Sequence, residues 1–262
     1  MIFAQNEFEI VDYRFIPKDL EALRLKPNGI NWAFGNDFLL LDSYNSELVL
    51  LKSTGKIIIS GGLGKRQNIY GELIWAGISP IGIQVVDRLE NEIIVLDLNL
   101  NRSHNISISH NLYPEIAQID PWGRLFMYSN TFNGIYVFEN DDVSNIPFID
   151  FSRDFYSNYC VEDFAINSDG ELAILGCDGI FNEFSQNGLK QKSIPVGIHN
   201  PQFMVSLRDD WFVFNSDGGC LSIYNSEKLS IPKIIPPILD IATINRSIAI
   251  LTKEQILVLN VK

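Results

Sequence analysis

The stretch AFGNDFLLLDSYNSELVLLKS, residues 33–53, decides the fold of this chain. Its apolar run 38–41 is closed by Asp42, and a second apolar run, 48–51, follows a polar turn. Runs this short, bounded by Asp, Asn, Ser and Gly, are typical of strands rather than helices. Neither run alternates strictly between apolar and polar residues, so we expect each strand to be covered on both faces.

The same pattern returns until the end of the chain. The residues that close the first apolar strand of each unit are Asp42, Asp87, Ser129, Gly176, Asn215 and Thr252. Successive markers lie 45, 42, 47, 39 and 37 residues apart, with a mean of 42. A period of about 40 residues with four short strands per unit is typical of a β-propeller rather than a helical solenoid. The 262 residues therefore predict an all-β fold: one domain, 1–262, forming a six-bladed propeller with four-stranded antiparallel blades.

The last unit has only three strands, near residues 238–244, 247–253 and 255–261. The alternating segment FEIVDYRF, residues 8–15, has no place in the first unit. Because an open ring would leave strand edges exposed, we expect this segment to complete blade six beside the last strand. Small residues on the inner strands are expected to converge at the axis, namely Ala33, Ala76, Ala117, Ala165 and Ala242.

Three segments of the chain resemble NHL-repeat propellers, at residues 61–80 (GGLGKRQNIYGELIWAGISP), 119–138 (IDPWGRLFMYSNTFNGIYVF) and 166–175 (INSDGELAIL). In that family a Gly-Gly-x-Gly connection leads into an inner strand with a small residue, then a strand, an Asp-x-x-Asn-like turn and another strand. The resemblance covers most of the chain at the level of pattern and implies the propeller fold. It implies no single function, because propellers host many activities.

The charge of the chain is strongly acidic, with 32 acids, 20 bases and a formal net charge of −12. Binding to a phosphate backbone needs Lys and Arg concentrated on one face, so no nucleic-acid partner is predicted. We interpret the acidity as a contribution to solubility. No stretch of 18 apolar residues occurs, so the sequence predicts no membrane span.

The three cysteines make an odd count, so at least one is free or pairs with another chain. Cys160 and Cys177 flank a predicted hairpin, and a symmetric turn would place them opposite each other and allow a disulfide. A glycine bulge at Gly170 would slip this register by one residue. We expect two buried thiols, with the disulfide as the alternative.

The N-terminal residues MIFAQ resemble the end of a secretory signal, although its charged and long apolar parts are missing. An ordinary N-terminus is the alternative. The sequence thus favours an extracytoplasmic location, periplasmic or secreted, and leaves the cytoplasm open.

The longest connections link one blade to the next, and they are residues 61–71, 109–114, 152–159 and 196–201. They are expected on the same face of the ring as the turns between the two apolar strands of each repeat, such as residues 41–48. We call this the long-loop face. Loops on a rigid scaffold commonly carry binding residues, and aromatic residues and Arg are enriched in interfaces. The candidate binding residues are Arg66, Tyr70, His110, Tyr113, Arg153, Phe155, Tyr156, Tyr159 and His199, with Tyr44 and Phe132 from hairpin turns. The alternative is that most of these rings seal the junctions between blades.

The predicted function is recognition of a protein or peptide, or another ligand, through the long-loop face, without catalysis or a cofactor. The alternative is a metal-dependent propeller lyase or lactone hydrolase at the mouth of the axial channel. Its candidates are His110, His199, Asp163, Asp240 and Glu115. No H-x-x-H or C-x-x-C spacing supports a metal site, so no metal ligand is predicted. A third hypothesis is a structural role as one subunit of a larger assembly.

Overall fold

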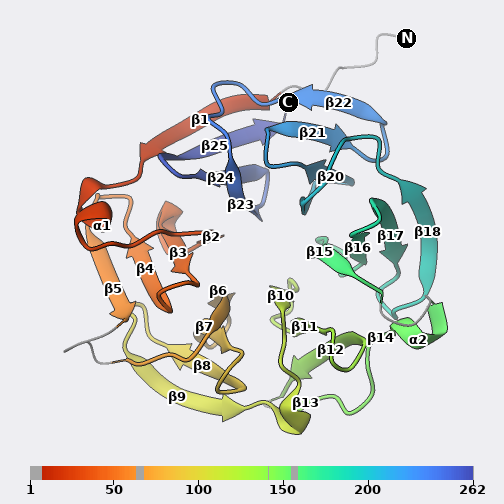
Figure 1. Ribbon diagram of the computed structural model, residues 1–262, viewed down its shortest axis with the longest axis horizontal. Coiled ribbons are helices and arrows are strands. Elements are labelled where there is room, and N and C mark those ends of the chain that lie inside the picture. Colours follow the sequence, from red (N-terminus) through yellow and green to blue (C-terminus); the bar gives the residue numbers. More distant parts are fainter. Residues whose placement is uncertain (1–7, 63–67, 141, 155–158, 262) are drawn as a thin grey trace.

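Six sheets surround a central axis in the computed structural model, which describes residues 8–62, 68–140, 142–154 and 159–261. Figure 1 shows them as the blades of a closed ring. Five sheets have four strands, and the outer position of blade three is occupied by two short strands. The predicted all-β, six-bladed fold with antiparallel blades is therefore confirmed.

Each blade runs from an inner strand at the axis to an outer strand at the rim. Blade one contains β2 (Gly29–Trp32), β3 (Phe38–Asp42), β4 (Glu47–Leu51) and β5 (Ile57–Gly61). Blade two contains β6 (Leu73–Ser79), β7 (Gly82–Asp87), β8 (Glu92–Leu96) and β9 (Arg102–Ser107). Blade three contains β10 (Ile116–Ile119), β11 (Leu125–Ser129), β12 (Gly134–Glu139), β13 (Asp142–Val143) and β14 (Ile149–Asp150).

The second half of the chain repeats this order. Blade four contains β15 (Val161–Ile166), β16 (Leu172–Gly176), β17 (Ile180–Phe184) and β18 (Lys190–Pro195). Blade five contains β19 (Phe203–Leu207), β20 (Asp210–Phe214), β21 (Gly219–Ser222) and β22 (Glu227–Ser230). Blade six contains β23 (Ile238–Ile244), β24 (Ser247–Thr252) and β25 (Gln255–Val261). Two short helices, α1 (Lys18–Ala22) and α2 (Phe151–Asp154), lie in connections between blades.

The N-terminal strand β1 (Phe8–Phe15) closes the ring by pairing antiparallel with β25. Phe8 faces Val261 in this ladder, and its ring lies 6.2 Å from that of Phe212 in blade five. The two ends of the chain thus complete one blade, as expected from the unpaired segment in the sequence (Figure 1).

Six apolar clusters form the core, and each lies between two neighbouring blades. The strands β3 and β4 are buried along their whole length, because each of their faces packs against a different blade. This explains the lack of alternation in the two runs of the repeat. Burial of these side chains is the main stabilising contribution to the fold.

The small residues expected at the axis occupy two kinds of position. Ala76, Ala117, Ala165 and Ala242 lie on inner strands and line the axial cavity. Ala33 does not belong to an inner strand: β2 ends at Trp32, and Ala33 begins the following turn, with its N–H bonded to the carbonyl of Asp37. The expectation was therefore wrong for Ala33.

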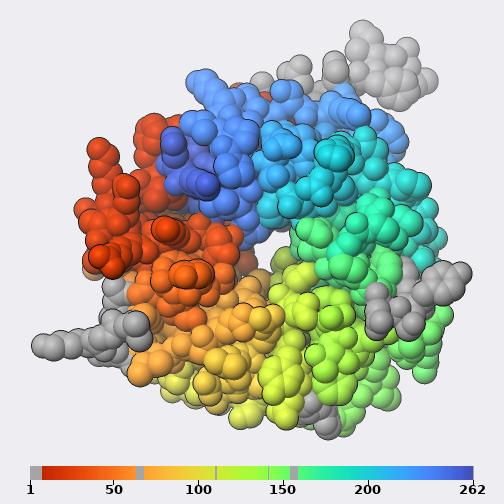
Figure 2. Space-filling model, in the orientation of Figure 1, coloured from red at the N-terminus to blue at the C-terminus, as the bar shows by residue number. Residues whose placement is uncertain are grey.

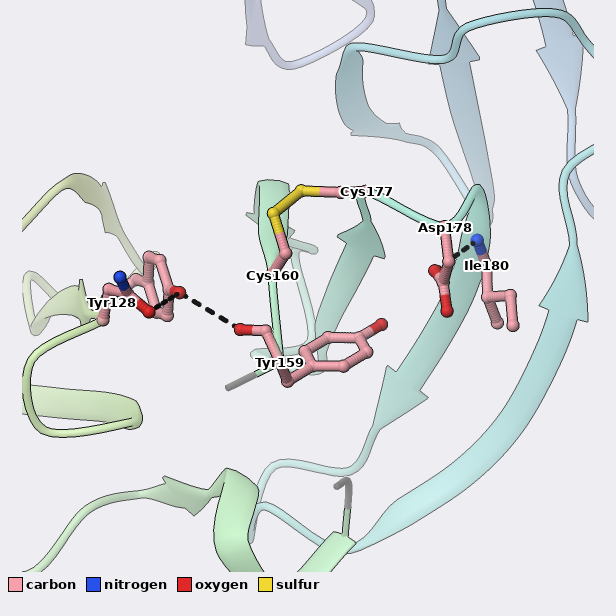
Figure 3. Close-up of a disulfide and its surroundings, with 7 residues drawn as sticks. Tyr128, Tyr159, Cys160, Cys177, Asp178 and Ile180 are labelled. Carbon is pink, nitrogen blue, oxygen red and sulfur yellow. Dashed lines mark hydrogen bonds between the residues drawn. A yellow bond between two sulfur atoms is a disulfide. The ribbon is translucent and has the colours of Figure 1, made fainter. Parts of the chain in front are cut away.

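Cys160 and Cys177 form a disulfide, so the expectation of two buried thiols was wrong (Figure 3). The turn at Gly170, with φ of 76°, does shift the register of β15 against β16. A bulge between Val161 and Asp163 shifts it back, which places the two cysteines opposite each other with their Cα atoms 5.5 Å apart. Both cysteines are exposed on the long-loop face, whereas Cys220 is a free buried thiol.

Candidate functional site

The inner strands surround a cavity of about 970 Å³ on the axis of the ring. All six inner strands contribute to its wall: β2, β6, β10, β15, β19 and β23. Figure 2 shows the hollow at the centre of the molecule. Its long-loop mouth lies where the inner strands begin, because the long connections enter the inner strands there.

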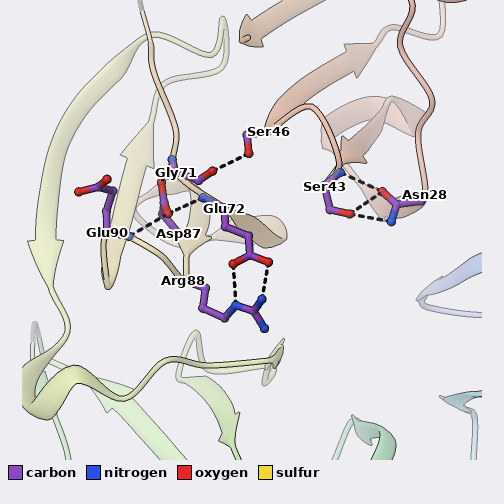
Figure 4. A network of polar contacts seen from close by, with 8 residues as sticks. All are labelled: Asn28, Ser43, Ser46, Gly71, Glu72, Asp87, Arg88 and Glu90. Carbon is purple, nitrogen blue, oxygen red and sulfur yellow. Dashed lines mark hydrogen bonds and ion pairs between the residues drawn. The ribbon is translucent and has the colours of Figure 1, made fainter. Parts of the chain in front are cut away.

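The wall of this cavity is acidic. Its described residues include six carboxylates and one cation, namely Glu72, Glu115, Asp120, Glu162, Asp163, Asp240 and Arg208. Glu115 and Glu162 are exposed at the long-loop mouth. Glu72 also lines the cavity and forms an ion pair with Arg88, whose Nε donates to Oε2 at 2.8 Å (Figure 4). A concave wall of one charge sign concentrates ions of the opposite sign.

Two half-buried carboxylates of the wall connect inner strands of neighbouring blades. Asp240 accepts a hydrogen bond from the N–H of Ile241 at 2.8 Å and from that of Ile30, in blade one, at 2.7 Å. Asp163 occupies the equivalent position in blade four, since each of the two follows a bulge in its inner strand.

Asp163 makes the same two kinds of contact. It accepts from the N–H of Phe164 at 2.8 Å and from that of Met204, in blade five, at 2.7 Å. An inner strand has no strand neighbour on its axial side, so these carboxylates satisfy N–H groups that the sheet leaves open. Blades four and five, and blades six and one, are joined in this way.

The protein environment raises the pKa of both carboxylates. Burial is the main cause for Asp240 and raises its pKa to about 7, against the two N–H donors, which lower it. Burial also raises the pKa of Asp163 well above its ordinary value, and the charge of Asp240 adds to this effect. The two groups therefore interact electrostatically through the cavity.

The markers of the repeat fasten the long loops to the hairpin turns beside them. Asp87 accepts hydrogen bonds from the N–H groups of Gly71 at 2.6 Å, Glu72 at 2.9 Å and Glu90 at 3.2 Å (Figure 4). Asp42 does the same in blade one, where the N–H of Lys26 donates to it at 2.7 Å. In blades one and two, the Asp that closes the second strand thus also holds the backbone that leads into the inner strand of the same blade.

The described candidate binding residues divide into buried and exposed groups. Tyr70 is buried at the junction of blades one and two, with its hydroxyl 2.8 Å from that of Ser60. Tyr159 is half-buried, accepts from Asn182 Nδ2 at 2.8 Å, and has its pKa raised mainly by burial.

Tyr113, Arg153 and His199 are exposed on the long-loop face. Arg153 pairs with Asp150 at 3.2 Å, and the carbonyl of His199 accepts a hydrogen bond from Asn215. From the hairpin turns, Tyr44 is 91% exposed and Phe132 is 43% exposed.

Four other candidates cannot be placed in this site. Arg66, Phe155 and Tyr156 lie outside the described residues, and of His110 only the backbone, in a short helical turn, is described. No group of three or more His, Cys, Asp and Glu side chains that could hold a metal ion occurs among the described residues. Within that same part of the chain, no helix is long and apolar enough to cross a membrane.

The interpretation of the sequence missed two carboxylates at the mouth, Glu72 and Glu162. A signal for them was present: Glu72, Glu115 and Glu162 precede their repeat markers by 15, 14 and 14 residues. The three acids are not at one equivalent position, but each lies within one residue of the beginning of its inner strand, β6, β10 or β15, so all three lie at the same end of the axis.

Similar solved structures include virginiamycin B lyase from Staphylococcus aureus, with a TM-score of 0.65 at 13% identity, covering 97% of this chain and 99% of that chain. The WD40 propeller domain of Doa1 has a TM-score of 0.61 at 10% identity, covering 97% of both chains. YCF48 bound to a D1 peptide has a TM-score of 0.59 at 12% identity, covering 96% of this chain and 79% of that chain.

No protein-family model matches the chain, and no curated protein matches it in sequence. Similarity at these identities shows the fold alone. The chain is a six-bladed β-propeller whose structural neighbours include a lyase, a WD40 propeller domain and a protein with a bound peptide.

Proposed function

We propose that this propeller binds a protein or peptide at the long-loop face, with a basic side chain of the partner seated in the acidic mouth of the axial cavity. The observation that carries the proposal is the long-loop mouth of that cavity, where the carboxylates of Glu115 and Glu162 are exposed near the Glu72–Arg88 ion pair. Opposite charges across an interface increase the association rate and exclude partners of the wrong sign.

The surroundings of the mouth favour a polypeptide over a small ion. Tyr44, Phe132 and Tyr113 are exposed on the same face, and aromatic side chains are the usual anchors of protein interfaces. The hydrogen bonds of Asp42 and Asp87 hold the loop ends in place before any partner arrives. A preorganised surface loses less conformational entropy when it binds.

The test is an array of immobilised peptides that contain one Lys or Arg between aromatic residues, beside the same sequences with that base changed to Glu. We expect the protein to bind peptides of the basic set. The double variant Glu115→Gln/Glu162→Gln removes two exposed carboxylates from the mouth, so its affinity for them should fall roughly tenfold.

The matched control is Asp209→Asn, which removes an exposed carboxylate between β19 and β20, at the opposite end of the ring. It should bind the same peptides with unchanged affinity. Equal binding of the basic and acidic sets, or equal loss in the control and in the double variant, would contradict the proposal.

A second candidate function is catalysis at the same mouth, and the raised pKa of Asp240 favours it. Carboxylates with raised pKa values in a cavity are typical of acid–base groups. Both Asp240 oxygens already accept backbone N–H groups, however, which accounts for the residue structurally. Elemental analysis of the purified protein tests the metal-dependent version: a stoichiometric divalent metal that Asp240→Asn removes would favour this candidate.

A further inference from the structure

The residues that directly precede the inner strands edge the long-loop mouth. In blades one, two, three and five they are polar and line the cavity, namely Asn28, Glu72, Glu115 and Gln202. Because each inner strand pairs with the strand that a repeat marker closes, the turn after the marker lies next to this residue. The first residues of these turns are Ser43, Arg88, Asn130 and Ser216, in the same order.

In blades one and five the turn residue and the residue before the inner strand form neutral hydrogen bonds. Asn28 Nδ2 donates to Ser43 Oγ at 2.8 Å, and the N–H of Ser43 donates back to Asn28 Oδ1 at 2.9 Å (Figure 4). The N–H of Ser216 donates to Gln202 Oε1 at 3.1 Å. Blade two makes this contact with two charged side chains instead, those of Glu72 and Arg88.

The backbone of blade two brings Glu72 and Arg88 together before any partner arrives. The N–H of Arg88 donates to the carbonyl of Glu72 at 2.8 Å. An added Cβ at Gly71 would lie 2.9 Å from Asp87 Oδ1, so the turn packs directly against the segment that leads into β6. The guanidinium then meets the carboxylate at two points, with Nε donating to Oε2 at 2.8 Å and Nη2 donating to Oε1. Two-point pairing is the strongest geometry for these groups.

Glu115 in blade three has a neutral neighbour in place of Arg88. The corresponding turn residue is Asn130, whose Oδ1 accepts a hydrogen bond from the hydroxyl of Tyr128 at 3.4 Å. Glu115 and Glu162 are exposed, and neither forms an ion pair within the described part of the chain. Their carboxylates are therefore open to a partner, whereas that of Glu72 is already bound.

The other charged residues of the cavity wall do not alter this balance at the mouth. Asp120 and Arg208 directly follow β10 and β19, so they lie at the other end of the axis. Asp163 and Asp240 accept backbone N–H groups. Three glutamates thus line the mouth, and Arg88 neutralises one of them.

We propose that Arg88 limits the mouth to one basic side chain of the partner, an inference that rests on the proposed function. Arg88 occupies Glu72 in place of a partner's base, which leaves Glu115 and Glu162 for a single base. A second base of the partner would have to displace Arg88, which is attached to the same chain and already in position, so it competes at a disadvantage. Arg88 is therefore a specificity-determining residue, because a pair of adjacent bases binds no better than one.

The first experiment measures fluorescence anisotropy of labelled peptides that carry one Arg, or two adjacent Arg, between aromatic residues. The unchanged protein should bind both peptides with similar affinity. The side chain of Glu72 is 41% exposed, so Arg88→Gln opens it to the second base and should increase the preference for two bases about fivefold. Glu72→Gln/Arg88→Gln should lose this preference again.

The matched control is Lys26→Gln, which removes an exposed base from the connection that leads into blade one on the same face. Its preference should equal that of the unchanged protein. An unchanged thermal unfolding curve verifies the fold of each variant.

A second experiment needs no partner. Carboxylates are coupled to glycine ethyl ester with a carbodiimide, and the labelled positions are read by mass spectrometry. Because the guanidinium contacts both oxygens of Glu72, this residue should react about threefold more slowly in the unchanged protein than in Arg88→Gln. Glu90, an exposed carboxylate two residues after Arg88, should react alike in both proteins.

The two experiments separate failure of this inference from failure of the proposed function. Equal labelling of Glu72 in the unchanged protein and in Arg88→Gln would overturn the role of Arg88, even if basic peptides bind. An equal preference for two bases in Arg88→Gln and in Glu72→Gln/Arg88→Gln would also overturn it, because the effect would then not depend on Glu72. Slow labelling of Glu72 without binding of any basic peptide would overturn the proposed function, and the specificity role with it.

Discussion

At the scale of single residues, Asp163 and Asp240 best show how one side chain serves both the ring and the cavity. Each carboxylate satisfies an N–H in its own strand and one in the next blade, and each also lines the cavity wall. Burial disfavours the ionised form, whereas the N–H donors favour it. The raised pKa values show that burial is the stronger effect.

This balance predicts a pH dependence of stability. The pKa of Asp240 is about 7 in the folded protein and 3.8 ordinarily, so the folded state holds an extra proton between these values. The free energy of unfolding should therefore be highest below about pH 4 for this group and fall as the pH rises to 7, by up to about 1.4 kcal/mol per pH unit.

Urea unfolding of Asp240→Asn at pH 4.5, 5.5 and 6.5 checks this prediction. The variant should show a smaller decline than the unchanged protein over this range, because only the contribution of Asp163, whose pKa is also raised, remains. Asp169→Asn, at an exposed carboxylate on a turn, should keep the decline. A variant with the same pH slope as the unchanged protein would show that Asp240 does not bind the extra proton.

At the scale of elements, the hairpin β15–β16 shows how two local irregularities combine. The turn at Gly170 moves the register by one residue and the bulge before Asp163 restores it, which brings Cys160 against Cys177. The disulfide lies at the start of an inner strand, next to the acidic mouth. The hydroxyl of Tyr128 in blade three donates to the carbonyl of Tyr159 at 3.2 Å, so the disulfide is also close to a blade junction (Figure 3).

Removing this disulfide should lower stability measurably. The cysteines are 17 residues apart, and closing a loop of that size in the unfolded chain stabilises the fold by about 3 kcal/mol in the chain-entropy model. We expect Cys160→Ser/Cys177→Ser to lower the free energy of unfolding in guanidinium by 2–3 kcal/mol, within the usual range of about 2–4 kcal/mol. The control is Cys220→Ser, at the buried free thiol: reductant should lower its free energy of unfolding by the same amount as that of the unchanged protein. If reductant leaves the free energy of unfolding of the unchanged protein as it was, the prediction is contradicted.

At the scale of the whole molecule, ring closure depends on one strand from the N-terminus. Strand β1 covers the edge of β25 and adds Phe8, Ile10 and Tyr13 to the junction of blades five and six. Without β1, the backbone groups of β25 are open to another chain.

Deleting residues 1–16 should therefore lower the melting temperature sharply and promote aggregation. Each buried large apolar side chain contributes about 1.5–3 kcal/mol, so the loss is several kcal/mol. Point variants sharpen the test: Ile10→Asp should destabilise the protein strongly, whereas Val11→Asp, at an exposed position, should be tolerated. Calorimetry of the three variants checks this, and an unchanged melting temperature after the deletion would contradict closure by β1.

The charge of the molecule is distributed unevenly at this scale. Carboxylates gather around the cavity and its long-loop mouth, whereas the short turns of the other face carry both signs, among them Lys56, Arg246, Asp97 and Asp142. A net charge describes the whole surface and not its parts, so the value of −12 alone indicates neither feature.

The sequence by itself determined the repeat, the number of blades and the closing strand. These follow from the spacing of short apolar runs and from one strand left without a partner in the repeat. Each run is recognised from neighbouring residues alone, and the repeats are counted along the chain, so no tertiary contact is needed. Strand β1 was therefore predictable to the residue, from Phe8 to Phe15. The markers Asp42 and Asp87 were also visible, although their hydrogen bonds to the long loops were not.

Only the tertiary structure decided what the axis contains. Asp240 meets Ile30 across 210 positions of sequence, and Trp122 covers a glycine 48 positions further along the chain. Such contacts depend on how much each blade is rotated against the next, which no local pattern encodes. The disulfide register depended likewise on a bulge and a turn acting together, because a shift of one residue in a strand reverses which side chains face each other.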